Sequence, residues 1–122
     1  MSQYDDAVAR YFAAWNATDA DVRAKAVADA WTEDGFYTDP LADVSGHDAV
    51  AAAIGGVHEQ FPGFEFRQTG PVDGHHDTAR FSWELVSVAD GSAPVAGSDV
   101  ITLAPDGRII SVFGFLDRVP GA

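Results

Sequence analysis

The sequence predicts an α+β fold in which three N-terminal helices pack on a strongly curved antiparallel sheet. Two observations predict this class. Up to about residue 61, apolar residues recur mostly at helical spacing, and helix-capping patterns precede them. After residue 63, four segments alternate apolar and polar residues and are joined by short turns, which is typical of consecutive antiparallel strands. Helices and strands segregated in this way form separate layers around one core.

Length, composition and charge narrow the class of protein further. With 122 residues and a hydrophobic content of 47%, we predict one globular domain over residues 1–122. The net charge of −12 disfavours nucleic acid and anionic membranes as partners, so the expected ligand is a small, neutral, apolar molecule. The absence of cysteine excludes disulfides and thiolate metal sites. No secretory signal or membrane-spanning apolar run is visible, so we expect a cytoplasmic protein.

The first helix is predicted to begin near Ser2. Ser2 and Asp5 have the spacing of a capping box, in which each residue satisfies a backbone N–H of the other. Residues at positions i, i+3, i+4 and i+7 then form one buried stripe, made of Val8, Tyr11, Phe12 and Trp15.

The second helix is predicted to begin after Thr18 or Asp19, since both residue types suit an N-cap. Its apolar face includes Trp31, and we expect it to end at Glu33–Gly35, where a glycine suits a left-handed C-cap. A short strand over residues 36–40 follows and is stopped by a proline.

Residues 41–46 are predicted to form a loop that leads into the third helix. Ser45 and Asp48 have capping-box spacing, which places the start of this helix near residue 46. Pro62–Gly63 is expected to stop it.

Four strands are predicted in the second half of the chain: Phe64–Val72, Thr78–Val88, Pro94–Leu103 and Arg108–Val119. Gly97 and Gly114, inside the last two, are expected to let the sheet bend around a pocket. In the third strand, alternation places Asp99 at the centre of an otherwise apolar face. A buried, unpaired carboxylate is costly, so Asp99 must be paired, hydrogen-bonded or protonated.

Tyr11, Asp39 and Asp99 are polar side chains at positions that the pattern directs toward the core. Each also has a purely structural interpretation. Tyr11 could be a core tyrosine whose hydroxyl reaches the surface. Asp39 could form an Asx turn. Asp99 could lie at a bulge or pair with an arginine such as Arg80 or Arg108.

Three stretches of the sequence resemble the nuclear-transport-factor-2-like superfamily and its SnoaL-like polyketide cyclases: "RYFAAWNATD", "YTDP…SGHDAV" and "GSDVITLAPDGRIISV". The resemblance covers nearly the whole chain. It implies a cone-shaped α+β barrel of the cystatin-like type, in which a curved sheet is closed by helices. It also implies a homodimer formed through the outer face of the sheet.

Within this superfamily, three positions are similar to those of ketosteroid isomerase. The resemblance implies that Asp39 is the general base, and that Tyr11 and a neutral Asp99 donate hydrogen bonds to an oxyanion. Two departures accompany it. The segment from Tyr11 to Asp39 is about one helical turn longer, and Ile54 stands where the isomerase has a supporting tyrosine.

The leading hypothesis is therefore a small cofactor-free isomerase or cyclase that acts through enolisation of an apolar ketone, polyketide- or steroid-like. We expect its pocket to be lined by Trp15, Tyr37, Ile54, Trp83 and Ile101.

Two alternatives remain open. A dehydratase or lyase could use His75 or His76 paired with Asp19, as the site of scytalone dehydratase suggests, although both histidines could equally be exposed hairpin residues. Their spacing does not favour a metal site, and none is predicted. The other alternative is a non-catalytic, dimerising module that binds a small molecule.

Overall fold

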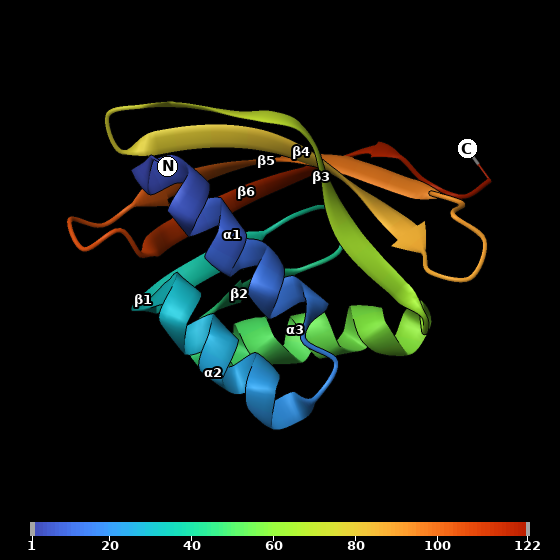
Figure 1. Cartoon of the computed structure of the whole chain (residues 1–122). Helices are drawn as coiled ribbons and strands as arrows, with labels where there is room; N and C mark the ends of the chain where they lie inside the picture. The colour runs from blue at the N-terminus through green and yellow to red at the C-terminus, as the bar shows by residue number, and fades with distance from the viewer. Residues whose placement is uncertain (1, 122) are drawn as a thin grey trace.

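Three helices pack against one six-stranded mixed sheet, as Figure 1 shows for the computed structural model, which describes residues 2–121. The helices are α1 (Gln3–Asn16), α2 (Ala20–Ala30) and α3 (His47–Gln60). The strands are β1 (Trp31–Thr38), β2 (Asp43–Ser45), β3 (Phe64–His75), β4 (Thr78–Ser87), β5 (Val95–Leu103) and β6 (Ile109–Arg118). None of the described helices is long and apolar enough to cross a membrane. The predicted α+β class is confirmed.

The sheet order is β2-β1-β6-β5-β4-β3. The predicted antiparallel meander is confirmed from β3 to β6. The prediction of a wholly antiparallel sheet is wrong, because β1 runs parallel to β6. A short turn forces two strands to be antiparallel, but β1 and β6 are far apart in the sequence, so no turn fixes their relative direction. This parallel pairing places the end of β1 beside the middle of β6.

Helix α1 follows its predicted pattern. The Ser2 hydroxyl accepts a hydrogen bond from the Asp5 backbone N–H (3.1 Å), and the Asp5 carboxylate accepts one from the Ser2 N–H (3.3 Å), so the capping box is formed. The predicted stripe is buried at Val8, Tyr11 and Trp15 and packs on the concave face of the sheet.

Helix α2 is shorter than predicted. It begins after Asp19, whose carboxylate accepts a hydrogen bond from the Val22 N–H (2.9 Å), but it ends at Ala30 rather than at Glu33–Gly35. Trp31 is fully buried as the first residue of β1 and lies opposite Ile109 of β6. Trp31 fits the apolar spacing of α2 and is also buried as a strand residue. The sequence pattern therefore did not reveal that the helix ends before it.

The segment predicted as a loop contains β2, whose three residues pair antiparallel with the end of β1. Ser45 belongs to this strand and does not cap α3. The N-cap is Gly46, with a φ of 85°, and no side chain supplies a capping hydrogen bond. The left-handed backbone at this position favours glycine, which allows the sharp change of direction from strand to helix.

Alternation in β5 is confirmed, since its odd-numbered residues are buried from Val95 to Leu103. Gly97 has no left-handed backbone; a Cβ there would collide with the Trp83 indole and would lie 2.6 Å from the Phe115 carbonyl oxygen. Glycine at this position therefore provides space for a neighbouring side chain.

Asn16 ties the end of α1 to β3. Its side-chain amide N–H donates to the Phe66 carbonyl (3.0 Å), and its amide oxygen accepts from the Phe66 N–H (2.7 Å). The side chain thus takes the place of a neighbouring strand for one residue of β3, and it fixes Trp15 close to Phe66, with ring centroids 4.9 Å apart.

We expect Asn16→Ala to destabilise the protein by about 1–3 kcal/mol, because both Phe66 backbone groups lose their partner in a half-buried setting. The matched control is Gln68→Ala, which removes an exposed side-chain hydrogen bond on the same strand. Urea unfolding of the two variants tests the difference, and equal small losses would contradict it.

Candidate active site

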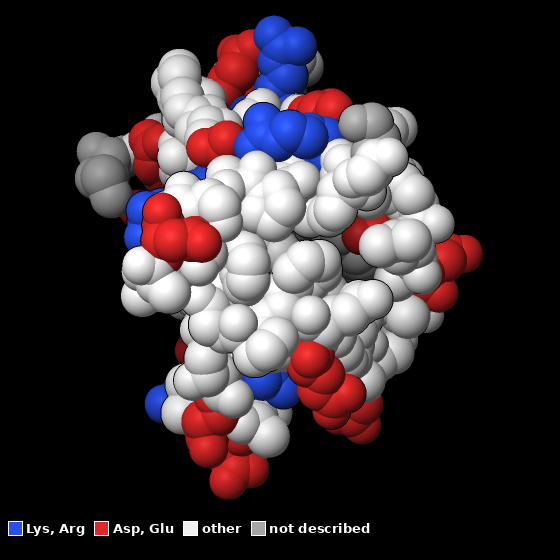
Figure 2. Space-filling model, turned by 90° about the vertical axis from the view of Figure 1, so that its right-hand side faces the viewer, with Lys and Arg blue, Asp and Glu red and all other residues white. Residues whose placement is uncertain are grey.

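A cavity of about 380 Å³ lies between α1, α3, the end of β1 and the concave face of the sheet. The cavity lies at one end of the molecule. Figure 1 shows the C-terminus, the end of α3 and the start of β5 at this end. Figure 2 shows this end as a broad uncharged surface with a hollow, with acidic and basic side chains around its margin. Tyr11, Tyr37 and Asp39 are the titratable residues of its lining.

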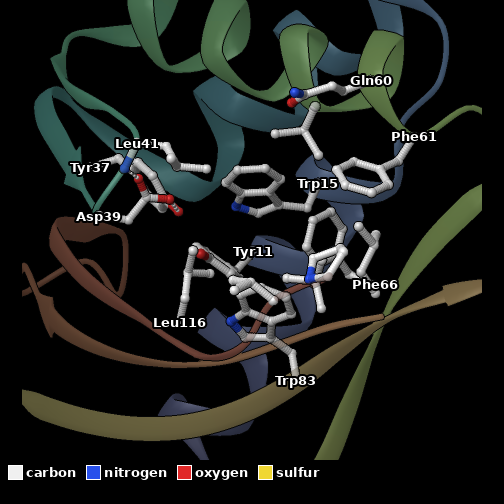
Figure 3. A pocket seen from close by; sticks show the side chains of 15 residues that line it. Tyr11, Trp15, Tyr37, Asp39, Leu41, Gln60, Phe61, Phe66, Trp83 and Leu116 are labelled. Atoms are coloured by element: carbon white, nitrogen blue, oxygen red, sulfur yellow. Dashed lines mark hydrogen bonds between the residues drawn. The ribbon is translucent and has the colours of Figure 1, made fainter. Parts of the chain in front are cut away.

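The structure places only some of the residues predicted for the lining at this cavity. Trp15, Tyr37 and Trp83 line the cavity, and Figure 3 shows their side chains around it. Ile54 and Ile101 do not: both are fully buried in the core. The concave face is longer than the cavity, and Ile101 lies toward the opposite end of β5, where it pairs with Ala79 and Val112. Residues of α3, β3 and the C-terminal end of the chain form the further apolar walls. Periodicity within a single strand does not identify these walls.

Tyr11 and Asp99 meet at the base of the cavity. The Tyr11 hydroxyl donates a hydrogen bond of 2.7 Å to Oδ2 of Asp99, and the two residues are only 3% and 1% exposed. The prediction that they are neighbours is confirmed. Tyr11 lines the cavity and Asp99 does not, so Asp99 lies behind the phenol. Any influence of Asp99 on a ligand in the resting geometry passes through Tyr11.

The structural alternatives for Asp99 do not hold. Arg80 pairs with Asp73 at 3.1 Å, and Arg108 pairs with Asp106 at 2.9 Å, so neither arginine neutralises Asp99. Asp99 also has regular partners on both neighbouring strands, and the irregularities in the β5–β6 pairing lie elsewhere. Asp99 is therefore a buried carboxyl group without a cationic partner.

Burial raises the pKa of Asp99 to about 7, although hydrogen bonding from Tyr11 and Trp83 opposes this, and the negative charges of Asp39 and Asp117 add to it. The other oxygen of Asp99, Oδ1, has no hydrogen-bond partner. The pKa of Tyr11 is raised well above its ordinary value by burial and then by the charge of Asp99, so this residue stays a neutral phenol.

Asp39 combines a structural and a site role. Its Oδ1 accepts hydrogen bonds from the N–H groups of Leu41 and Ala42, both at 2.8 Å, which is the Asx turn that the sequence allowed. Its Oδ2 accepts a hydrogen bond from the Tyr37 hydroxyl, and the carboxylate lines the cavity. Figure 3 shows Tyr37 and Asp39 together at one side of the pocket. Burial and then the charge of Asp99 raise the pKa of Tyr37, so it too remains a neutral donor.

The structure separates the residues of the histidine hypothesis. His75 and His76 lie at the exposed β3–β4 turn, where the His76 carbonyl accepts a hydrogen bond from Tyr4 at the start of α1. Asp19 follows the other end of α1 and caps α2. The 14 residues of α1 span about 21 Å, so no His–Asp pair forms, and Figure 1 shows the two regions at opposite ends of the molecule.

The chemistry available at this site is proton transfer in an apolar cavity. Asp39 lines the cavity, and its three hydrogen bonds leave about one of the four lone pairs of its carboxylate free. Two neutral phenols, Tyr11 of α1 and Tyr37 of β1, line the same cavity. Within residues 2–121, no group of three or more His, Cys, Asp or Glu is arranged to hold a metal ion.

A SnoaL-like domain model matches residues 8–112, which is most of the chain. The protein belongs to the SnoaL-like family. An Agrobacterium tumefaciens member of this family, provisionally called an isomerase, is 42% identical, with a TM-score of 0.90 over 96% of this chain and 99% of that one. The comparison with curated proteins gives no match.

More distant structures support the fold alone. A Jannaschia protein, provisionally called a SnoaL-like polyketide cyclase, is 21% identical, with a TM-score of 0.76 over 94% of this chain and 85% of that one. A Nostoc punctiforme protein of unknown function with a cystatin-like fold is 13% identical, with a TM-score of 0.70 over 98% and 92% of the two chains. The SnoaL-like domain described here has the cystatin-like fold that is named for the Nostoc protein.

Burial of Asp99 gives a pH-dependent stability. Because its folded-state pKa of about 7 exceeds the ordinary value of 3.8, the folded state holds this proton more tightly than the unfolded chain. The contribution of this proton to the free energy of unfolding is fully present below about pH 4. It is lost as the pH rises to about 7, and the loss is roughly 4 kcal/mol in total. Asp99→Asn, which stays neutral, should therefore gain stability relative to the native protein over this window.

Urea unfolding of both proteins at pH 4.5 and pH 8 measures this difference. Asp43→Asn, at an exposed position in β2, controls for the loss of one acidic group. Parallel stability profiles for the native protein and Asp99→Asn would show that the carboxyl group titrates normally.

Proposed function

We propose that this SnoaL-like domain is a cofactor-free isomerase or cyclase that acts by enolisation of an apolar ketone of polyketide or steroid type. The observation that carries the proposal is the presence of Asp39 and Tyr11 on one apolar cavity, with Asp99 hydrogen-bonded behind Tyr11. Such a cavity offers a base for the C–H group and a donor for the carbonyl oxygen of the same molecule.

Asp39 is the base in this scheme. It takes a proton from the carbon next to the carbonyl group, and the electron pair of that C–H bond forms the enolate. Delivery of the same proton to a second carbon gives the isomer. In ring formation, the enolate carbon attacks a second carbonyl carbon of the same molecule, the π electrons of that C=O bond move onto its oxygen, and this oxygen takes the proton from Asp39 to become a hydroxyl group. The hydrogen bonds from Leu41 and Ala42 hold the carboxylate in place for both steps.

Tyr11 is the donor to the enolate oxygen. When Asp99 is protonated, its O–H can donate to the Tyr11 oxygen, which leaves the Tyr11 proton free for the ligand. When Asp99 is ionised, it accepts the hydrogen bond that Tyr11 donates in the resting structure. The neutral form of Asp99 therefore supports catalysis, and burial favours that form up to about pH 7, the pKa of the group.

The lining also supports a neutral substrate. Among residues 2–121, no lysine, arginine or histidine lines it, and its aromatic walls come from α1, β1, β3, β4 and Phe61 after α3. A carboxylate or phosphate on the ligand would lose its hydration without gaining a cationic partner. A cavity of about 380 Å³ lies at the small end of the range typical of ligand pockets.

Asp39→Asn should lower kcat/KM by roughly 10²–10⁴-fold, because the amide keeps an acceptor for the turn but has no basic lone pair. Tyr11→Phe should lower it by roughly 10²–10³-fold through loss of the oxyanion donor. The compounds used in this assay are β,γ-unsaturated cyclic ketones of one to four rings. Ultraviolet absorbance follows their conversion to the conjugated isomers.

The exposed variant Asp43→Asn serves as the control and should turn over normally. If Asp39→Asn retains full activity, the base is assigned wrongly. If the native protein binds these ketones without converting any of them, the pocket belongs to a binding module.

We also propose that two copies associate through the outer face of the sheet. Strand β6 exposes Ile110, Phe113 and Phe115 there, at 40%, 40% and 59%, and Phe36 of β1 packs against Phe113. The dimer that the family resemblance implies would cover this apolar patch.

Sedimentation at micromolar to millimolar concentration should show a dimer, and Phe115→Glu should shift it to monomer because a charge would enter the interface. Val88→Glu, which changes another exposed apolar residue outside this strand, should leave the dimer intact. A native protein that stays monomeric throughout this range would refute the association.

A further inference from the structure

Gly114 occupies the point where three strands bring the site together. Strand β6 lies between β1 and β5 in the sheet. On one side, Gly114 is the direct partner of Asp99 in β5. On the other, the parallel pairing with β1 ends at Thr38 and Phe113, so Asp39 follows beside Gly114. The middle position between the two aspartates thus has no side chain.

The empty position is what allows the two aspartates to approach each other. A Cβ on Gly114 would lie 2.8 Å from Oδ1 of Asp99 and 3.2 Å from Cβ of Asp39. The sum of these distances places Oδ1 of Asp99 within about 6 Å of Cβ of Asp39. Strands on either side of a third strand are about 9–10 Å apart. The Asp99 carboxyl closes much of this gap, because its Oδ1 extends over the glycine toward Asp39.

Gly114 does not need to be glycine for conformational reasons, because its backbone is not left-handed. The nearest neighbours of its absent Cβ are the unpartnered Oδ1 of Asp99, Asp39 and the Thr38 carbonyl. A contact of 2.8 Å is closer than a real Cβ tolerates, so any side chain here would move Asp99 against Tyr11 or move Asp39 away.

We propose that Gly114 is a positioning residue that couples the carboxyl groups of Asp39 and Asp99, so that together they carry one negative charge. While Asp39 is ionised, its charge adds to the burial that keeps the Asp99 carboxyl protonated. The role assigned to this pair rests on the proposed enolisation, but its existence does not.

The surroundings of Asp99 leave Asp39 as the principal charged neighbour. Helix α1 contributes the neutral Tyr11, β1 contributes the neutral Tyr37 and the charged Asp39, and β6 contributes Asp117. Asp117 is exposed, so solvent screens its charge. After burial, the charge of Asp39 is the largest influence that raises the pKa of Asp99.

Coupling of this kind would adjust the oxyanion donor during the reaction. When Asp39 accepts the proton from the substrate carbon, the negative charge moves to the enolate oxygen and the total charge stays the same. The group that opposed ionisation of Asp99 is then neutral, so Asp99 becomes a stronger donor to Tyr11 at the moment when Tyr11 must stabilise the oxyanion.

A double-mutant cycle tests the coupling without any substrate. The pKa of Asp99 is measured by carbon-13 NMR of aspartate-labelled native protein, Asp39→Asn, Gly114→Ala and the double variant, with the resonance assigned through Asp99→Asn. We expect Asp39→Asn to lower the pKa of Asp99 by about one unit, and by less than half as much in the Gly114→Ala background.

Two matched controls accompany the cycle. Asp43→Asn removes an exposed negative charge and should leave the pKa of Asp99 unchanged. Gly56→Ala adds a methyl group where nothing lies within 4 Å and should leave the Asp39 effect at full size.

An Asp99 pKa that does not respond to Asp39→Asn overturns the proposal, even if Gly114→Ala fails to fold. An equal response in the native and Gly114→Ala backgrounds overturns the role of Gly114. Ketone turnover is scored separately: coupling without turnover removes the enolisation assignment alone, and turnover without coupling removes this proposal alone.

Discussion

The hydrogen bond from Tyr11 to Asp99 joins the helical layer to the sheet at the point where the fold places a carboxyl group in its core. Desolvation of an aspartate is unfavourable, and no cation compensates for it here. The structure accommodates the group by favouring its neutral form and by giving it one phenolic partner at 2.7 Å. The packing of α1 on β5 is thus tied to the protonation state of one residue. The same contact gives Tyr11 its fixed orientation on the cavity.

Most of the fold could be predicted because its signals are local. The capping box at Ser2, the stripe of α1 and the alternation of β5 each depend on residues close in the sequence, and the structure confirms them. The errors arise where pairing with a strand outside the segment determines the secondary structure. Trp31 leaves the helical pattern because β6 pairs with it, and residues 43–45 become a strand because β1 is beside them. No spacing within a short segment carries that information.

The candidate site shows the same division. Alternation and helical spacing indicated that Tyr11 and Asp99 point inward, and the structure places them in contact across 88 residues. They did not show that Asp99 would lie behind Tyr11 and outside the lining, because the depth of a side chain depends on what covers it. Ile54 and Ile101 were expected in the lining for the same reason: periodicity assigns a face and says nothing of where along that face the cavity lies.

The glycines inside strands β5 and β6 show what a missing side chain can do in a buried sheet. Gly97 and Gly114 were expected to let the sheet bend, and the structure adds that both provide room for neighbours: the Trp83 indole at Gly97, and Asp99 with Asp39 at Gly114. A buried glycine opposite a buried acid is a juxtaposition that only strand register reveals. In this acidic protein, that register places Asp39 and the Asp99 carboxyl on either side of one glycine. Burial is the first cause that favours the protonated form of Asp99, and the charge of Asp39 adds to it.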